Sequence, residues 1–106
     1  MERLEEKGNP VRKVVKHDEW LFEQLQDPEF AAEFLNEANE DDDPRTYLTA
    51  LRKVVEARGG IAEVAEKTKL SRETLYRTLS ARGNPTIKTL NAVLRATGLK
   101  IGVTAH

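Results

Sequence analysis

The apolar residues of this chain recur at the spacing of three and four that one face of an α-helix requires, in short segments separated by prolines and glycines. Several such segments lie between residues 44 and 98, and shorter ones lie between residues 18 and 40. Leu99, Ile101 and Val103 alternate along the chain instead, which allows one short C-terminal strand. The pattern therefore predicts an all-α fold in which any strand lies at the C-terminal end.

Turn and cap residues set the expected helix ends in the second half of the chain. Helices are expected over residues 44 to about 58, from residue 60 to the turn at Lys69 and Leu70, over residues 72 to about 80, and from residue 87 to Gly98. Ser71 and Thr86 are the expected N-caps of the last two helices. The side chains expected to face inward are Tyr47, Leu48, Leu51, Val54, Val55, Ile61, Val64, Ala65, Leu75, Leu79, Ile87, Leu90, Val93 and Leu94.

Two shorter helices are expected before residue 44. Asp18 should cap the first, and Asp27 followed by Pro28 should start the second. Their apolar residues are Trp20, Leu21, Phe22, Leu25, Phe30, Ala31, Phe34, Leu35 and Ala38. Residues 1–16 are mostly polar and are expected to form a flexible arm.

The charges of the chain are divided sharply between its two halves. Residues 45–106 hold twelve lysines and arginines against four acids, whereas residues 1–44 hold five bases against fourteen acids. Residues 17–44 contain eleven of those acids and no lysine or arginine. This division predicts an anionic partner for the second half and a cationic partner for the first. A solvated acidic face that only improves solubility is the alternative for the first half.

The spacing of Ala65, Leu70 and Leu75 is typical of a helix-turn-helix, in which a small residue, a turn hydrophobe and a mid-helix hydrophobe let two helices cross closely. The second helix then lies in the major groove of DNA. The predicted DNA contacts on and beside that helix are Ser71, Arg72, Glu73, Thr74, Tyr76 and Arg77. Arg82, Thr86 and Lys88 lie near the start of the last helix and are predicted to bind phosphates.

Residues 45–99 resemble the five-helix domain of lambda-repressor-like regulators. More narrowly, residues 70–80 with the following Gly83-Asn84-Pro85-Thr86 resemble the family of addiction-module antidote proteins, and residues 18–25 and 34–38 resemble that family's N-terminal helices. Lys69 departs from the family's turn, which commonly carries glycine. The resemblance implies an antitoxin that binds a RelE/ParE-like toxin and represses its own operon.

This interpretation divides the chain into a flexible arm (1–16), an acidic helical extension (17–43) and a helix-turn-helix DNA-binding domain (44–106). The extension is the predicted site for a basic toxin, through Trp20, Phe22, Phe34, Asp41, Asp42 and Asp43. The protein is expected to bind operator DNA as a homodimer, and the C-terminal strand is expected to pair with its copy or with residues 11–15. A stand-alone phage-like repressor without a toxin, and an adaptor that uses the same helices only for protein contacts, are the alternatives.

Other classes of protein receive little support. The chain has no cysteine, so disulfides and thiolate metal sites are excluded. His17 and His106 are its only histidines and match no catalytic pattern, so neither an enzyme nor a cofactor or metal site is expected. No apolar run approaches the roughly 20 residues of a membrane span, and the first residues lack the apolar segment of a signal peptide. A cytoplasmic protein without a membrane contact is therefore expected.

Overall fold

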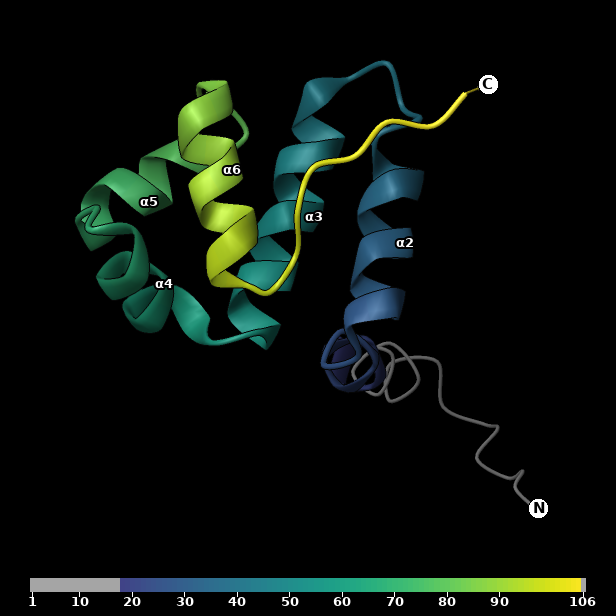
Figure 1. The fold of residues 1–106 in the computed structure, drawn as a ribbon, viewed down its shortest axis with the longest axis horizontal. Coiled ribbons are helices and arrows are strands. Elements are labelled where there is room, and N and C mark those ends of the chain that lie inside the picture. Colours follow the sequence, from purple (N-terminus) through teal and green to yellow (C-terminus); the bar gives the residue numbers. More distant parts are fainter. Residues whose placement is uncertain (1–17, 106) are drawn as a thin grey trace.

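The computed structural model describes residues 18–105, and the regular secondary structure in that range is entirely helical (Figure 1). A first helical segment covers residues 18–24. The helices that follow are α2 (Pro28–Ala38), α3 (Pro44–Ala57), α4 (Gly60–Thr68), α5 (Arg72–Thr78) and α6 (Ile87–Ala96). The predicted all-α fold is confirmed, and the predicted helix ends agree with the observed ones to within two residues.

Local capping explains where most of these helices begin. Asp27 and Asp43 accept hydrogen bonds from backbone N–H groups of the first turns of α2 and α3, and a proline occupies the first position of each helix. Ser71 and Thr86 cap α5 and α6 in the same way. The predicted cap at Asp18 is wrong, because Asp18 is itself helical.

One hydrophobic core extends through the described part of the chain. α2 packs on α3, α3 on α4, and α4 on both α5 and α6, with α2 and α5 on opposite sides of α3 (Figure 1). The side chains at the centre are Leu25, Leu51, Val54, Val55, Val64, Leu75, Leu79 and Val93, which are almost fully buried. Burial of such side chains is the main stabilising term of a fold of this size.

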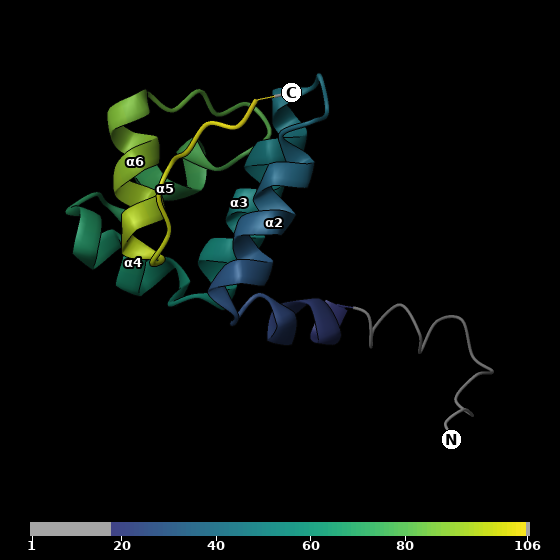
Figure 2. The ribbon, with the colours of Figure 1, turned by 45° about the vertical axis from the view of Figure 1, so that its right-hand side comes forward.

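The acidic extension shares this core. Leu25 and Leu35 are buried in the same cluster as the α3 side chains, and Gln26 Nε2 donates a hydrogen bond of 2.7 Å to the carbonyl oxygen of Ala57 at the end of α3. Figure 2 shows the first helical segment at the foot of α2, lying crosswise to it. The extension is therefore docked on the second half of the chain.

One predicted core residue is wrong. Ile87 opens α6 and is 72% exposed, whereas Val93 and Leu94 further along the helix are buried as predicted. Helical spacing continues to the first residue of a helix, but the layer of neighbours that covers the helix ends earlier. Periodicity alone therefore overestimates burial at a helix end.

The predicted C-terminal strand is also absent from the described chain. Residues 99–105 have no regular structure, and Ile101 and Val103 are 41% and 94% exposed. Residues 100–105 make no hydrogen bond with any described residue. A strand needs a neighbouring strand for its backbone groups, and the helices described here supply none. Pairing with residues 11–15, and the predicted flexible arm, lie outside the described residues.

Candidate functional site

The three residues whose spacing predicted a helix-turn-helix lie on α4, in the turn and on α5, and all three pack in the core. Ala65 of α4 and Leu75 of α5 are buried, and Leu70 in the turn packs partly buried against the core. Lys69 ends α4 in the left-handed conformation with φ of 63°, which explains why glycine would suit this position. The turn thus presents α5 at the surface, with α4 behind it.

The cap of α5 occupies two of the side chains predicted to contact DNA. Ser71 Oγ accepts a hydrogen bond from the backbone N–H of Thr74 at 3.0 Å and donates one to Thr74 Oγ1 at 2.8 Å. Both hydroxyls therefore stabilise the start of the helix. Ser71 stays exposed, but its hydroxyl hydrogen is used by Thr74, so the donors that remain for an anion beside it are backbone N–H groups of the first turn of α5.

Four other predicted contacts form the exposed face of α5. Arg72, Glu73, Tyr76 and Arg77 are all exposed, and Tyr76 retains 46% of its accessible surface. The two arginines and Glu73 form no ion pair with a described residue. Arg72, Glu73 and Arg77 can hydrogen-bond base edges, and they are thus gathered on one short helix without an ion-pair partner among the described residues.

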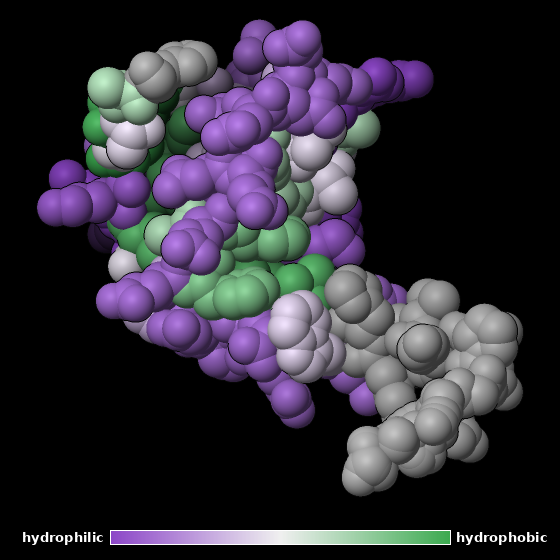
Figure 3. Space-filling view, turned by 90° about the vertical axis from the view of Figure 1, so that its right-hand side faces the viewer, coloured by the Kyte–Doolittle hydropathy of each residue, from purple (hydrophilic) through white to green (hydrophobic). Residues whose placement is uncertain are grey.

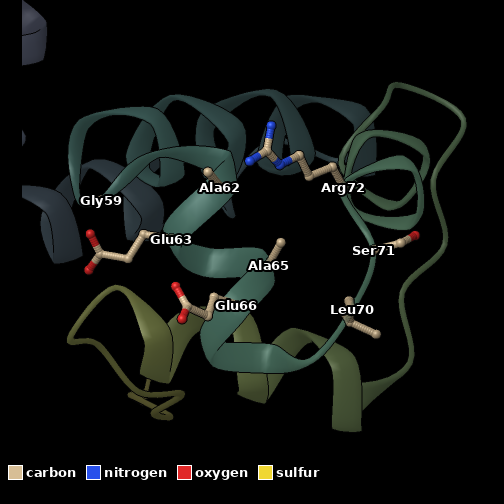
Figure 4. A pocket seen from close by; sticks show the side chains of 8 residues that line it. All are labelled: Gly59, Ala62, Glu63, Ala65, Glu66, Leu70, Ser71 and Arg72. Carbon is tan, nitrogen blue, oxygen red and sulfur yellow. The ribbon is translucent and has the colours of Figure 1, made fainter.

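An open hollow separates α4 from the start of α5 (Figure 4). It is lined by Gly59, Ala62, Glu63, Ala65, Glu66, Leu70, Ser71 and Arg72. The Arg72 side chain extends across the hollow towards Ala62, while Glu63 and Glu66 project on the α4 side (Figure 4). Glu63 forms an ion pair with Lys67 at 2.8 Å and not with Arg72, so the guanidinium of Arg72 remains available to a ligand.

The predicted phosphate contacts lie on the loop between α5 and α6 and on the first turn of α6. Arg82, Thr86 and Lys88 are exposed, and Thr86 Oγ1 caps α6 by accepting a hydrogen bond from the N–H of Thr89 at 3.1 Å. Gly83 holds this loop against the end of α5, where an added Cβ would lie 1.9 Å from the carbonyl oxygen of Thr78. The tight loop fixes where the basic side chains lie relative to α5.

The predicted toxin residues lie on the far side of α3 from α5. Trp20 and Phe30 contact edge to face, with ring centroids 5.9 Å apart, and Phe34 lies one turn further along α2. Trp20 and Phe22 are among the exposed large hydrophobic side chains. Figure 3 shows an apolar area next to the start of the described chain, bordered by hydrophilic side chains.

A groove of about 510 Å³ between α2 and α3 brings the predicted Phe34 together with residues that the sequence did not mark as part of a site. It is lined by Phe34, Glu37, Ala38, Arg45, Thr46, Thr49, Ala50 and Lys53. Those from α3 follow helical spacing on the side of the helix that faces α2. The only sequence signal for them was a polar stripe interrupted by a small residue, which is typical of any solvated helix.

The three predicted acids of the α2–α3 connection differ in their hydrogen bonds and ion pairs. Asp43 caps α3 and pairs with Arg45 at 2.7 Å, and the hydrogen bonds from the Arg45 side chain lower the pKa of the Asp43 carboxyl. Asp41 accepts hydrogen bonds of 2.9 Å from the N–H of Asp43 and from Thr46 Oγ1. Asp42 alone has no hydrogen bond or ion pair with a described residue. The connection is therefore largely a structured cap.

Metal and membrane sites find no support in the part of the chain that the structure describes. Within residues 18–105, no cluster of histidine, aspartate and glutamate side chains has an arrangement that could hold a metal ion. In the same range, no helix is both long enough and apolar enough to cross a bilayer.

These features define a class of small helical protein in which a basic, exposed helix and an acidic, aromatic segment occupy different sides of one core. The chain belongs to the family of probable addiction module antidote proteins, whose sequence model matches residues 16–105. It is also similar to an uncharacterised protein of Haemophilus influenzae, with 37% identity over 70 residues that cover 66% of this chain and 71% of the relative. No solved structure matches the chain.

Proposed function

We propose that this chain is the antidote of a toxin–antidote module, that it binds operator DNA as a dimer to repress its own operon, and that it neutralises a basic RelE/ParE-like toxin in the cytoplasm. Membership of the antidote family supports the toxin partner. The observation that carries the DNA-binding part is the exposed face of α5, where Arg72 and Arg77 have no ion-pair partner among the described residues.

The proposed DNA-binding unit comprises residues 44–106 in a lambda-repressor-like arrangement, with α4 and α5 as a helix-turn-helix. α5 enters the major groove, which is about 12 Å wide. Arg72 and Arg77 donate to guanine O6 and N7, and Glu73 accepts from a cytosine amino group. Arg82, Thr86 and Lys88 bind the phosphates beside the groove and fix the register of α5 on the duplex.

The proposed toxin surface comprises the helical extension, residues 17–43. Its aromatic side chains Trp20, Phe22 and Phe34 would supply most of the affinity, because large buried anchors dominate interface energetics. The acids of the extension, with Asp41, Asp42 and Asp43 after α2 among them, would speed association with a basic partner. Since α2 and α5 lie on opposite sides of α3 (Figure 1), one protomer can bind toxin and DNA together.

A gel shift against the DNA upstream of the chain's own gene tests the DNA-binding part. One α5 reads only a half-site, so we expect a dimer on a pseudo-palindrome whose half-sites lie roughly 34–36 Å apart. If each protomer neutralises about four phosphates, the slope of log K against log salt should be roughly −7. A flat salt response, or no preference for the upstream DNA over random DNA, would contradict the proposal.

The alternatives make different predictions in a second experiment. The chain is co-expressed with the protein encoded beside it, and co-purification and growth rescue are measured. A stand-alone repressor would shift its operator and leave its neighbour unbound, whereas an adaptor would bind protein without shifting DNA. The family and the aromatic, acidic extension favour the antidote over both alternatives.

A further inference from the structure

Arg52 lies outside the residues that the sequence marked for DNA, yet its guanidinium contacts the exposed face of α5. It belongs to α3, where the neighbouring Leu51 and Val54 are fully buried. The Arg52 side chain extends away from these buried residues, and its guanidinium carbon lies 5.2 Å from the ring centroid of Tyr76. Tyr76 lies one turn after Arg72 on α5, so Arg52 lies beside the face of the proposed reading helix that carries Arg72.

The contacts of Arg52 hold its guanidinium beside α5 while leaving its outer donors unused. The Tyr76 ring contacts the guanidinium, and Nε forms an ion pair with Glu56, donating to Oε2 at 3.3 Å. No described residue accepts a hydrogen bond from Nη1 or Nη2. The side chain is 41% exposed, so those donors open to solvent. A planar cation held by a ring, with a free pair of donors, suits bidentate binding of a phosphate.

The position of Arg52 beside α5 selects the kind of DNA atom that it can reach. A helix in the major groove faces base edges directly, and the groove walls on either side of it are phosphates. Arg52 belongs to α3 and not to α5, so in the proposed complex it would meet a wall of the groove instead of base edges. Glu56 accepts the hydrogen bond of Nε, so Nη1 and Nη2 remain to donate to a phosphate of that wall.

We propose that Arg52 forms a DNA-phosphate site on α3, with Tyr76 as the residue that positions its guanidinium. The ligand is a phosphodiester of duplex DNA, bound through Nη1 and Nη2 without base preference. The inference rests on the proposed DNA binding and extends the interface from α5, the loop before α6 and the first turn of α6 to α3.

The test uses the full-length chain and a labelled duplex that the wild-type protein enriches from a random-sequence library, with affinity measured by fluorescence anisotropy. Arg52→Ala should weaken binding of this duplex and of unrelated duplexes by the same factor, roughly tenfold. The steepness of its salt dependence should also fall by about 0.9 for each phosphate that is no longer neutralised, or about 1.8 for a dimer. Arg52→Lys keeps the charge without the planar fork and should recover only part of the affinity.

Tyr76→Leu tests the positioning role. It should weaken binding, and the Arg52→Ala/Tyr76→Leu double variant should lose less than the product of the two single effects. Lys53→Ala is the matched control, since Lys53 is the next basic residue of α3 and lines the groove towards α2. Circular dichroism should show unchanged helicity in all variants, because Arg52, Lys53 and Tyr76 lie at the surface.

The possible failures are distinguishable. Wild-type protein that binds no duplex would overturn the proposed function and this inference together. Wild-type binding with an Arg52→Ala affinity and salt slope equal to those of Lys53→Ala would overturn the phosphate site alone. A weakening by Arg52→Ala that is confined to one duplex sequence would also overturn it, because it would place Arg52 on a base.

Discussion

The guanidinium of Arg58 is hydrogen-bonded to Thr97, since its Nε donates to the Thr97 carbonyl oxygen at 2.7 Å. Its Nη1 group donates to the carbonyl oxygens of Leu25, at 3.3 Å, and of Gln26. The ends of α3 and α6 and the turn before α2 are thus joined by one side chain. These carbonyls lie at helix ends, where no further helical turn supplies a donor.

Arg58→Met should lower the free energy of unfolding by about 2–3 kcal/mol, because it keeps the aliphatic stem and removes charged hydrogen bonds to partly buried carbonyls. Urea unfolding followed by circular dichroism measures the change. Arg95→Met is the control, since Arg95 is exposed on α6 and makes no ion pair with a described residue. Equal stability of the two variants would show that the Arg58 contacts contribute nothing net.

Lys69→Gly should raise the free energy of unfolding by about 1 kcal/mol. Lys69 has φ of 63°, a conformation in which a Cβ is strained and glycine is not. Lys69→Ala separates backbone strain from loss of the lysine charge, and it should be no more stable than the wild-type chain. If the alanine variant gains as much as the glycine variant, the charge is responsible rather than the backbone.

Gly83→Ala should destabilise the fold by about 1–3 kcal/mol, since the new methyl group would overlap the carbonyl oxygen of Thr78 and displace the loop before α6. The same displacement should weaken DNA binding through Arg82 and Lys88. Gly102→Ala is the matched control, because nothing lies within 4 Å of a Cβ at that position. Thermal unfolding of both variants measures the difference, and an unaffected Gly83→Ala variant would refute the close approach.

Arg72→Ala and Arg77→Ala should each cost about 1–3 kcal/mol of operator binding and relax the base preference at the bases they contact. Lys88→Ala should weaken binding to every sequence alike, because a phosphate carries no sequence information. Competition between the operator and unrelated DNA measures both effects. A double variant of Arg72 and Arg77 that keeps full operator selectivity would place the reading surface elsewhere.

Trp20→Ala and Phe34→Ala should speed dissociation of the co-purified toxin, whereas Asp42→Lys should mainly slow its association. Asp42 is the suitable acid for charge reversal, because Asp41 and Asp43 hold the start of α3 and their replacement would disturb the fold. Surface plasmon resonance of the purified pair separates the two rates. Unchanged kinetics in all three variants would move the toxin contact off the helical extension.

Much of the helical arrangement followed from local signals. The aspartates before Pro28 and Pro44 predicted the starts of α2 and α3, and Ser71 and Thr86 predicted those of α5 and α6. The spacing of Ala65 and Leu75 predicted which side chains of α4 and α5 are buried. Ile87 was predicted wrongly because helical spacing does not show where a covering neighbour ends, and the strand at Ile101 because alternation does not show whether a partner strand exists.

The amino-acid sequence by itself determined the helices, their caps and the opposite charges of the two halves, because capping and periodicity depend on residues three or four positions apart. Only the tertiary structure decided which polar side chains already have a hydrogen-bond or cation–π partner within the protein. Arg58 binds the carbonyl of Thr97, which lies 39 residues further along the chain, and Arg52 contacts a ring on another helix. Such partners come from distant parts of the chain, and packing of the helices is what brings them within reach.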